Sequence, residues 1–186
     1  MKNLIIVSGV NGAGKTTFGI PYTQIKGYEF LNADEIAKKI TDAGKPNAMI
    51  KAGRIFFQRL NNYLKKEKSF VVETTLSGSY INKVARKAQK KGYKITVIYI
   101  FIDNVETSIQ RVRSRVLKGG HDVPLEDLLR RFSRSKANFW ENFTEIADEW
   151  FLMYNGTEGF QRVARGEERE FSIENKVLFS LFHSKK

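Results

Sequence analysis

Cysteine is absent from this chain, and that absence excludes several kinds of site. Without thiols the protein forms no disulfide and offers no thiolate ligand to a metal ion. A reducing compartment suits such a chain, so we expect a cytoplasmic protein. A long apolar run is also missing at the N-terminus, where the four residues Leu4–Val7 are followed at once by Ser8 and Gly9. That run is too short for a signal peptide or a membrane span, and we expect a buried strand and no membrane partner.

The remaining composition indicates one globular domain of 186 residues, with 41% hydrophobic and 28% charged residues. A net charge of +12 would attract phosphorylated small molecules, nucleic acid or acidic surfaces. Basic residues gather between Glu73 and Asp103, where no acid occurs: Lys83, Arg86, Lys87, Lys90, Lys91 and Lys94. The apolar residues among them have helical spacing, so the cations belong mostly to a solvated helix face. Aromatic residues are not interleaved there, and a nucleic-acid partner is not expected.

Short apolar runs alternate with longer amphipathic stretches, which predicts a parallel sheet covered by helices. Five strands are expected, at Leu4–Ser8, Tyr28–Leu31, Ser69–Thr74, Lys94–Ile102 and Trp150–Tyr154. Helices are expected from Gly14 to Ile20, where Pro21 should end the first, then over Asp34–Ile40, from Pro46 and Asn47 onwards, and in the tail Phe171–Phe182. No internal repeat or linker occurs, so we predict a single domain over residues 1–186.

The segment from Gly9 to Thr16 has the spacing G-x-x-x-x-G-K-[ST], between a predicted strand and a predicted helix. Its glycines let backbone N–H groups turn towards phosphate oxygens, and the helix N-terminus adds favourable dipole charge. Lys15 can reach the β- and γ-phosphates, and the Thr16 hydroxyl can ligate Mg²⁺. We therefore expect a three-layer P-loop sandwich that binds ATP or GTP through Gly9, Asn11, Gly12, Ala13, Gly14, Lys15, Thr16 and Thr17.

Other P-loop classes lack their further motifs here. The D-x-x-G and N-K-x-D motifs of regulatory GTPases do not occur. A motor or AAA-type ATPase has an apolar strand ending in Asp-Glu, whereas Asp103 is followed by Asn104. Asp103 with Glu106 fits a helix N-cap better. Leu76–Gly78 resembles the start of an ABC-transporter signature, but its remainder is missing. A small phosphotransferase is the class that remains.

Two acidic residues stand at the ends of predicted strands, Asp34 and Glu73. The carboxyl ends of parallel strands form the edge at which ligands bind in open α/β sheets. Asp34 is therefore a candidate base for an accepting hydroxyl, although it could instead cap the helix that begins at Glu35. Their shared position at one edge favours a role for both acids in a site.

Residues 111–136 contain eight Lys and Arg against three acids. Gly119–Gly120 interrupts the segment, and Pro124 starts a new helix with Leu125, Leu128, Leu129 and Phe132 facing inwards. This profile is typical of a helical lid that closes arginines over phosphates, because the guanidinium fork matches phosphate oxygens. The alternative is a solvated pair of basic helices. We expect His121, beside the two glycines, to make a local hydrogen bond.

Four ordered pieces together resemble the zeta-toxin-like P-loop kinases, a family that includes bacterial UDP-N-acetylglucosamine kinases. They are GVNGAGKTT at 9–17, LNADEIA at 31–37, VVETTLSG at 71–78 and RVRSRVLKGGHDVPLEDLLRRF at 111–132. The resemblance implies an ATP- and Mg²⁺-dependent kinase acting on a hydroxyl of a nucleotide sugar. It also implies that Asp34 is the general base and that Glu73 and Thr75 lie on the substrate side.

The same resemblance makes Arg111 the first phosphate-contacting arginine, with Arg115 or Arg131 as the second. The lid is shorter here than in the plasmid-borne toxins, and its Gly-Gly-His sequence differs, so the acceptor stays open. Another small metabolite or a nucleic-acid 5′ end is the alternative acceptor. A nucleotide-gated binding protein without transfer activity is the alternative class. Neither toxicity nor an antitoxin partner is assumed.

Overall fold

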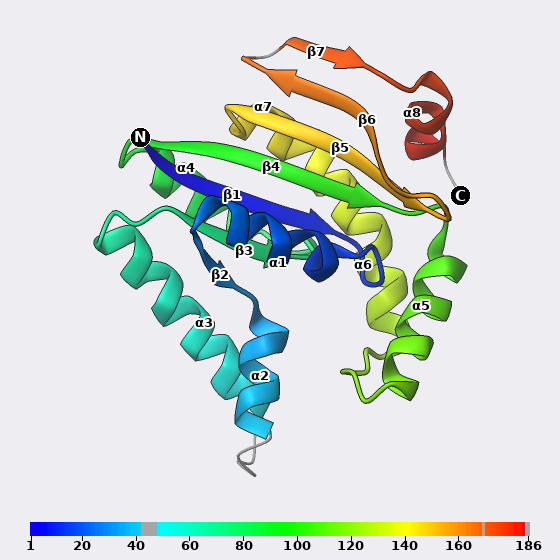
Figure 1. Ribbon diagram of the computed structural model, residues 1–186, viewed down its shortest axis with the longest axis horizontal. Coiled ribbons are helices and arrows are strands. Elements are labelled where there is room, and N and C mark those ends of the chain that lie inside the picture. Colours follow the sequence, from blue (N-terminus) through cyan, green and yellow to red (C-terminus); the bar gives the residue numbers. More distant parts are fainter. Residues whose placement is uncertain (42–47, 169, 185–186) are drawn as a thin grey trace.

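The computed structural model describes residues 1–41, 48–168 and 170–184, and its centre is one twisted sheet. Within these residues the sheet has seven strands in the order β2-β3-β1-β4-β5-β6-β7 (Figure 1). Five run parallel: β1 Lys2–Gly9, β2 Glu29–Leu31, β3 Phe70–Thr74, β4 Tyr93–Phe101 and β5 Glu149–Gly156. The last two, β6 Gly159–Glu167 and β7 Glu170–Ile173, are antiparallel to their neighbours. The predicted α/β fold is confirmed.

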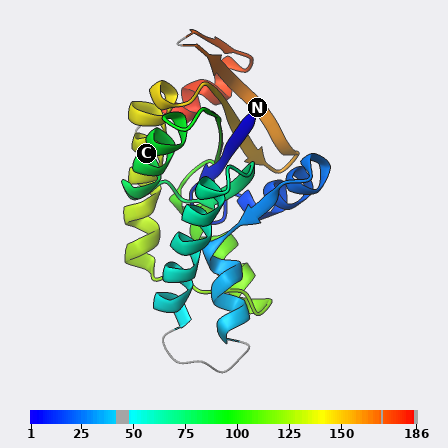
Figure 2. The ribbon, with the colours of Figure 1, turned by 90° about the vertical axis from the view of Figure 1, so that its left-hand side faces the viewer.

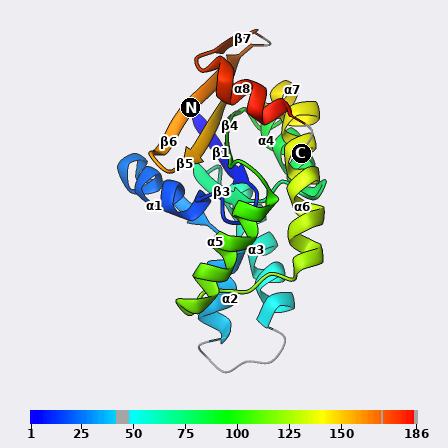
Figure 3. The ribbon, with the colours of Figure 1, turned by 90° about the vertical axis from the view of Figure 1, so that its right-hand side faces the viewer.

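Helices cover both faces of the sheet, as a parallel sheet requires. They are α1 Lys15–Lys26, α2 Ala33–Thr41, α3 Ala48–Lys65, α4 Tyr80–Gln89, α5 Val105–Leu117, α6 Leu125–Asn138, the π-helical turn η1 Phe139–Phe143, α7 Thr144–Ile146 and α8 Lys176–His183. Figures 2 and 3 show α1 on one side of the sheet and α4, α6 and α7 on the other. The helix pairs α2–α3 and α5–α6 extend beyond the strands (Figures 1 and 3). No helix among the described residues has the length and apolar content to cross a bilayer.

Alternating residues of β1 supply the two layers of the core. Leu4 and Ile6 belong to the large cluster with α3, α4 and η1, while Ile5 and Val7 belong to the cluster beneath α1. All four side chains are at most 4% exposed. The apolar residues of α4 are buried and its cations exposed, as the helical spacing predicts. Most of the basic stretch is therefore a solvated helix face, whereas Lys94 lies on β4 and pairs with Glu149 over 3.4 Å.

Two predictions about the elements were wrong. Pro21 lies inside α1, which continues to Lys26 and ends at Gly27, a residue with a left-handed φ of 65°. Proline deprives one turn of a backbone hydrogen bond but here does not end the helix, because the exposed face around Pro21 leaves the freed carbonyl to solvent. The tail does not begin as a helix: Glu170–Ile173 extends the sheet, and only Lys176–His183 is helical. The expected helix start at Pro46 and Asn47 lies outside the described residues.

The basic segment forms the expected helix pair, with differences in its details. Asn104, rather than Asp103, caps α5, because its side chain accepts a hydrogen bond from the Thr107 backbone N–H over 2.8 Å. In α6, Leu128 is 4% exposed, but Leu125 and Leu129 are 52% and 48% exposed. The predicted inward direction of these two was wrong because α6 packs on α5 along one narrow stripe.

Candidate active site

A cavity of about 370 Å³ opens where the loop after β1 meets the carboxyl ends of β2 and β3. Helices α5 and α6 close its far side. Its lining contains Asn11, Gly12, Gly14, Lys15, Thr16, Thr17, Asn32, Asp34, Glu73, Thr74, Thr75, Arg111, Arg115 and Arg131. Apart from Gly9 and Ala13, every residue expected in the site lines this one cavity. Residues from five parts of the chain, far apart in sequence, are thus brought together.

The backbone of the loop explains its glycines. Gly12 and Gly14 have φ values of 77° and 89°, which residues other than glycine rarely adopt. Gly9 and Ala13 do not line the cavity and pack against the protein interior. A Cβ at Gly9 would lie 2.0 Å from the Ile100 carbonyl oxygen, so β4 leaves no room for one. The side chain of Ala13 is fully buried. The loop is therefore shaped by its neighbours as well as by its own sequence.

Lys15 is buried at the base of the cavity, where its Nζ donates a hydrogen bond to the Val10 carbonyl over 2.8 Å. Burial lowers the pKa of Lys15, while the carboxylates of Glu73 and Asp34 act in the opposite direction. Arg115 and Arg131 also lower that pKa, because like charges repel. A bound triphosphate would favour the charged ammonium. This arrangement fits a lysine that binds phosphate.

Glu73 faces the phosphate loop. Its Oε2 accepts hydrogen bonds from the Thr16 hydroxyl over 2.8 Å and from Asn32 Nδ2 over 2.7 Å. Burial raises the pKa of Glu73, and Lys15 and the two hydrogen bonds oppose that shift. The parallel register of β1 and β3 causes the contact, because it pairs Val7 with Glu73 at the point where both strands end.

The Thr16 and Glu73 oxygens suit Mg²⁺, which prefers hard oxygen ligands and retains several waters. In the described residues no group of three or more His, Cys, Asp or Glu side chains could hold a metal by itself. A cation here would therefore take its remaining ligands from phosphate oxygens and water, as Mg²⁺ does in nucleotide sites. The donor set fits this ion.

Asp34 does not cap its helix. The side-chain oxygen of Asn32 accepts hydrogen bonds from the backbone N–H groups of Asp34, over 2.7 Å, and Glu35, over 3.1 Å. Asn32 thus serves the cap, and the Asp34 carboxylate lines the cavity instead. The alternative prediction, that Asp34 caps this helix, was wrong. Asn32 was not recognised from the sequence, although its place between a short strand and a helix is a typical cap position.

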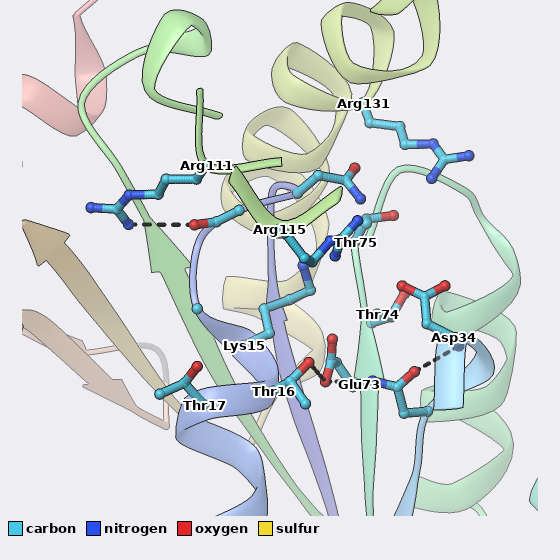
Figure 4. Close-up of a pocket in the computed structure, with 14 residues that line it drawn as sticks. Lys15, Thr16, Thr17, Asp34, Glu73, Thr74, Thr75, Arg111, Arg115 and Arg131 are labelled. Atoms are coloured by element: carbon cyan, nitrogen blue, oxygen red, sulfur yellow. Dashed lines mark hydrogen bonds between the residues drawn. The ribbon is translucent and has the colours of Figure 1, made fainter. Parts of the chain in front are cut away.

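The three arginines of the cavity, Arg111, Arg115 and Arg131, differ in position and in hydrogen-bond partners. Figure 4 shows Lys15 and Arg115 in the middle of the cavity, with Asp34 on one side and Arg111 on the other, its guanidinium directed away from Asp34. Arg111 donates to the carbonyls of Gly12, over 3.3 Å, and Asn155, over 3.0 Å. Arg115 donates to the His121 carbonyl over 2.6 Å, and its buried Nε has no partner within the described structure. Arg131 pairs with Asp127 over 2.8 Å.

Thr74 and Thr75 enter the cavity from a constrained turn after β3. The next residue, Leu76, is fully buried and has a left-handed φ of 55°. Its carbonyl accepts a hydrogen bond from Asn138 Nδ2 over 2.6 Å, and its N–H donates to the Thr74 hydroxyl over 3.2 Å. Helix α6 therefore holds this turn, and the same helix carries Arg131.

A strand, a glycine loop around a buried lysine, and an acid on the neighbouring strand define a P-loop protein, and the fold is that of the P-loop kinases. More specifically, the chain belongs to the family described as AAA domain, whose model matches residues 4–137. From the sequence we disfavoured a motor or AAA-type ATPase because no Asp-Glu pair follows β4, yet the family that matches carries the AAA description. In the structure Asp103 is engaged elsewhere, accepting a hydrogen bond from the Tyr154 hydroxyl over 2.7 Å.

Three similar proteins bear on this assignment. An uncharacterized protein of Haemophilus influenzae is 32% identical over 126 residues, which are 68% of this chain and 89% of that protein. A chain of the AvrRxo1-ORF1:-ORF2 complex with ATP has a TM-score of 0.78 at 20% identity, covering 99% of this chain and 64% of that one. A chain of the PezAT chromosomal toxin–antitoxin system of Streptococcus pneumoniae has a TM-score of 0.67 at 18% identity, covering all of this chain and 80% of that one. The two structures show the shared fold.

Proposed function

We propose that this protein transfers the γ-phosphoryl group of ATP to a hydroxyl group of a small molecule, in the manner of the zeta-toxin-like kinases. One observation carries the proposal: Lys15 and the Asp34 carboxylate line the same cavity, together with Arg115 and Arg131. A lysine in the phosphate loop serves binding alone equally well. Phosphoryl transfer also needs a base and cations near the γ-phosphate. Asp34, whose carboxylate does not cap its helix, and the two arginines in the same cavity can supply them.

The donor half of the site holds ATP. Backbone N–H groups of the loop and the Lys15 ammonium would bind the β- and γ-phosphates. Thr16 and Glu73 would hold Mg²⁺, which would supply positive charge beside those oxygens. In this proposal Glu73 serves the metal side of the site, where its hydrogen bond with Thr16 lies, and Thr75 serves the acceptor side.

The acceptor half contains the chemistry of transfer. Asp34 accepts the proton of the acceptor hydroxyl as that oxygen attacks the γ-phosphorus. The bond from the γ-phosphorus to the bridging oxygen breaks, and ADP leaves with the electron pair. Arg115 and Arg131 would face the negative charge on the moving group, since guanidinium forks match its oxygens. Arg111 would act on the loop, because its hydrogen bonds go to the Gly12 and Asn155 carbonyls.

For the acceptor we propose a nucleotide sugar such as UDP-N-acetylglucosamine. The four motifs that resemble the zeta-toxin-like kinases support this choice, and so does the fold shared with the PezAT chain. Cationic side chains on the acceptor side, Arg115 and Arg131, would suit an acceptor that carries its own phosphates. Another phosphorylated metabolite or a nucleic-acid 5′ end is the competing acceptor.

The test is to incubate the purified protein with ATP, Mg²⁺ and UDP-N-acetylglucosamine and to measure ADP release and product mass. A gain of one phosphate on the sugar supports the proposal in full. Phosphorylation of another compound in a metabolite extract, or of an oligonucleotide 5′ end, would retain the kinase and replace its acceptor. Binding of ATP with no product from any acceptor would contradict transfer, and would favour a nucleotide-gated binding protein.

Location and partner belong to the same proposal. The absence of cysteine and the use of ATP favour the cytoplasm. The PezAT neighbour is described as a toxin–antitoxin system, and AvrRxo1-ORF1 is described with ORF2. Induced expression decides whether this chain is toxic too: growth arrest by the wild type, absent with Lys15→Ala, would support a need for a neutralising protein. Equal growth would contradict it.

A further inference from the structure

Asn32 lies between the two acidic residues of the candidate site and uses both ends of its amide. Its side chain is buried, with only 5% of the residue exposed. The oxygen accepts hydrogen bonds from the backbone N–H groups of Asp34 and Glu35, over 2.7 and 3.1 Å. The nitrogen donates to Oε2 of Glu73 over 2.7 Å. One side chain is thus bonded to the start of α2 and to the end of β3.

The strand register produces this position. Strands β2 and β3 are parallel and pair Leu31 with Val72, so the next residue of each strand, Asn32 and Glu73, stand beside one another. The same Glu73 oxygen accepts the Thr16 hydroxyl over 2.8 Å. A continuous chain of hydrogen bonds therefore runs from Thr16 through Glu73 and Asn32 to the backbone of Asp34.

The residue type at position 32 distinguishes two roles. Ser, Asp and Asn cap helices about equally well, so the cap alone does not require an amide. Of these three side chains, only the amide divides the two bonds between two atoms, its oxygen accepting from the helix and its nitrogen donating to a carboxylate. The donated hydrogen bond matters because Glu73 is largely buried, and a buried carboxylate that loses a partner is strongly disfavoured.

We propose that Asn32 is a positioning residue of the phosphoryl-transfer reaction, which holds Asp34 at a set distance from the Thr16–Glu73 pair. This inference rests on the proposed function. Asp34 is placed through its own backbone N–H, at the first turn of α2, and Glu73 through its carboxylate. Errors of about 1 Å in such placement can reduce a rate about a hundredfold.

Two variants separate the cap from the placement. Asn32→Ser and Asn32→Asp each keep an oxygen that can cap α2, and each removes the amide nitrogen that donates to Glu73. Asn32→Asp also places a second carboxylate beside Glu73, so Asn32→Ser is the cleaner of the two changes. A matched control is Asn175, which caps α8 by accepting from the Leu178 backbone N–H over 3.0 Å and does not line the cavity. Asn175→Ser makes the same chemical change at a helix cap that lies outside the candidate site.

Three measurements are made on each variant: the melting temperature, the affinity for ATP with Mg²⁺ and with excess chelator, and kcat with UDP-N-acetylglucosamine. We expect Asn32→Ser to fold and to melt a few degrees below the wild type, because Glu73 keeps the hydrogen bond from Thr16 but loses the one from Asn32. Its gain in ATP affinity on adding Mg²⁺ should fall about tenfold, the effect of losing one hydrogen bond to a charged group. Its kcat should fall at least as far, and Asn175→Ser should change neither quantity.

The opposite outcome is equally distinct. If both Asn32 variants keep the wild-type response to Mg²⁺ and the wild-type kcat, Asn32 is only a helix cap and the inference is overturned. The affinity measurements need no acceptor, so they decide this point even where no transfer is seen. Failure of the wild type to phosphorylate any acceptor would contradict the proposed function separately.

Discussion

The side chain of Asn155 donates a hydrogen bond to the backbone carbonyl of Ala13 over 2.9 Å, although 142 positions separate the two residues. The Asn155 carbonyl accepts from Arg111, which also donates to the Gly12 carbonyl. A Cβ on Gly14 would lie 2.5 Å from the Asn155 amide nitrogen. The end of β5 therefore braces the phosphate loop from outside, and it lies beyond the residues 4–137 that the family model matches.

Asn155→Ala should weaken the binding of ADP and ATP equally, by about fivefold to tenfold, because the loop loses one buried hydrogen bond that shapes it. Calorimetric titration measures both affinities. Gln161→Ala is the control, since Gln161 lies on the adjacent strand β6 and does not line the cavity. Unchanged ADP affinity in Asn155→Ala would show that the loop keeps its shape without this contact.

The arginines should separate by the step that they affect. Arg111→Ala should weaken ADP and ATP binding alike, because its hydrogen bonds go to the carbonyls that shape the loop. Arg115→Ala should leave ADP affinity unchanged and lower kcat by about 10³-fold, the range seen for arginines that face a transferred phosphoryl group. Steady-state kinetics and ADP titration measure the two effects. A fall in kcat with Arg111→Ala at unchanged ADP affinity would reverse the assignment.

Asp34→Asn should lower kcat by about 10²- to 10⁴-fold, the usual contribution of a general base, while ATP affinity stays the same. The substitution leaves the backbone hydrogen bond to Asn32 in place, so α2 should keep its start. Glu35→Gln, one position further on at an exposed residue, is the matched control. Transfer by Asp34→Asn at the parent rate would show that Asp34 is not the base.

Leu76 offers a test of stability, because it is fully buried and has a left-handed backbone. Leu76→Ala should reduce the free energy of unfolding by about 2–5 kcal/mol through the cavity it leaves. Glycine ordinarily destabilises further, yet here it relieves a backbone strain of about 1–2 kcal/mol. We therefore expect Leu76→Gly to be at least as stable as Leu76→Ala in urea unfolding. Clearly lower stability of the glycine variant would contradict the strain argument.

His183 should make stability depend on pH. It packs against Trp140 and Phe179, with ring centroids 4.4 and 4.6 Å away. Burial lowers the pKa of His183 below its usual 6.5, and Lys136 adds to the shift. The unfolded chain thus binds the proton more readily, and stability is lost as the pH falls below about 6.5. Thermal melts from pH 8 to 5 should show a shallower loss for His183→Gln, and an equal loss would exclude this residue as the cause.

Local sequence signals were sufficient to predict where the phosphate loop and the two acids, Asp34 and Glu73, lie in the fold. The loop is encoded within one short segment, and the acids follow apolar strands whose parallel pairing brings their ends together. The contacts of Arg111 were not predictable, because they depend on Asn155 at the end of β5. Strands β6 and β7 were missed for a different reason. In β7 the apolar residues Phe171 and Ile173 alternate over only four positions, too few to set a strand apart from the helical spacing predicted for the tail.

The central place of β1 has a consequence for how the protein is made. β1 leaves the ribosome well before its two neighbours in the sheet, which begin only at Phe70 and Tyr93. Until then Leu4–Val7 have no strand to pair with, and long loops must close before they do. The brace at Asn155 arrives later still. Nascent or truncated chains that end before β4 should therefore expose the apolar residues of β1 and depend on chaperones, and nucleotide binding should appear only once β5 has been made.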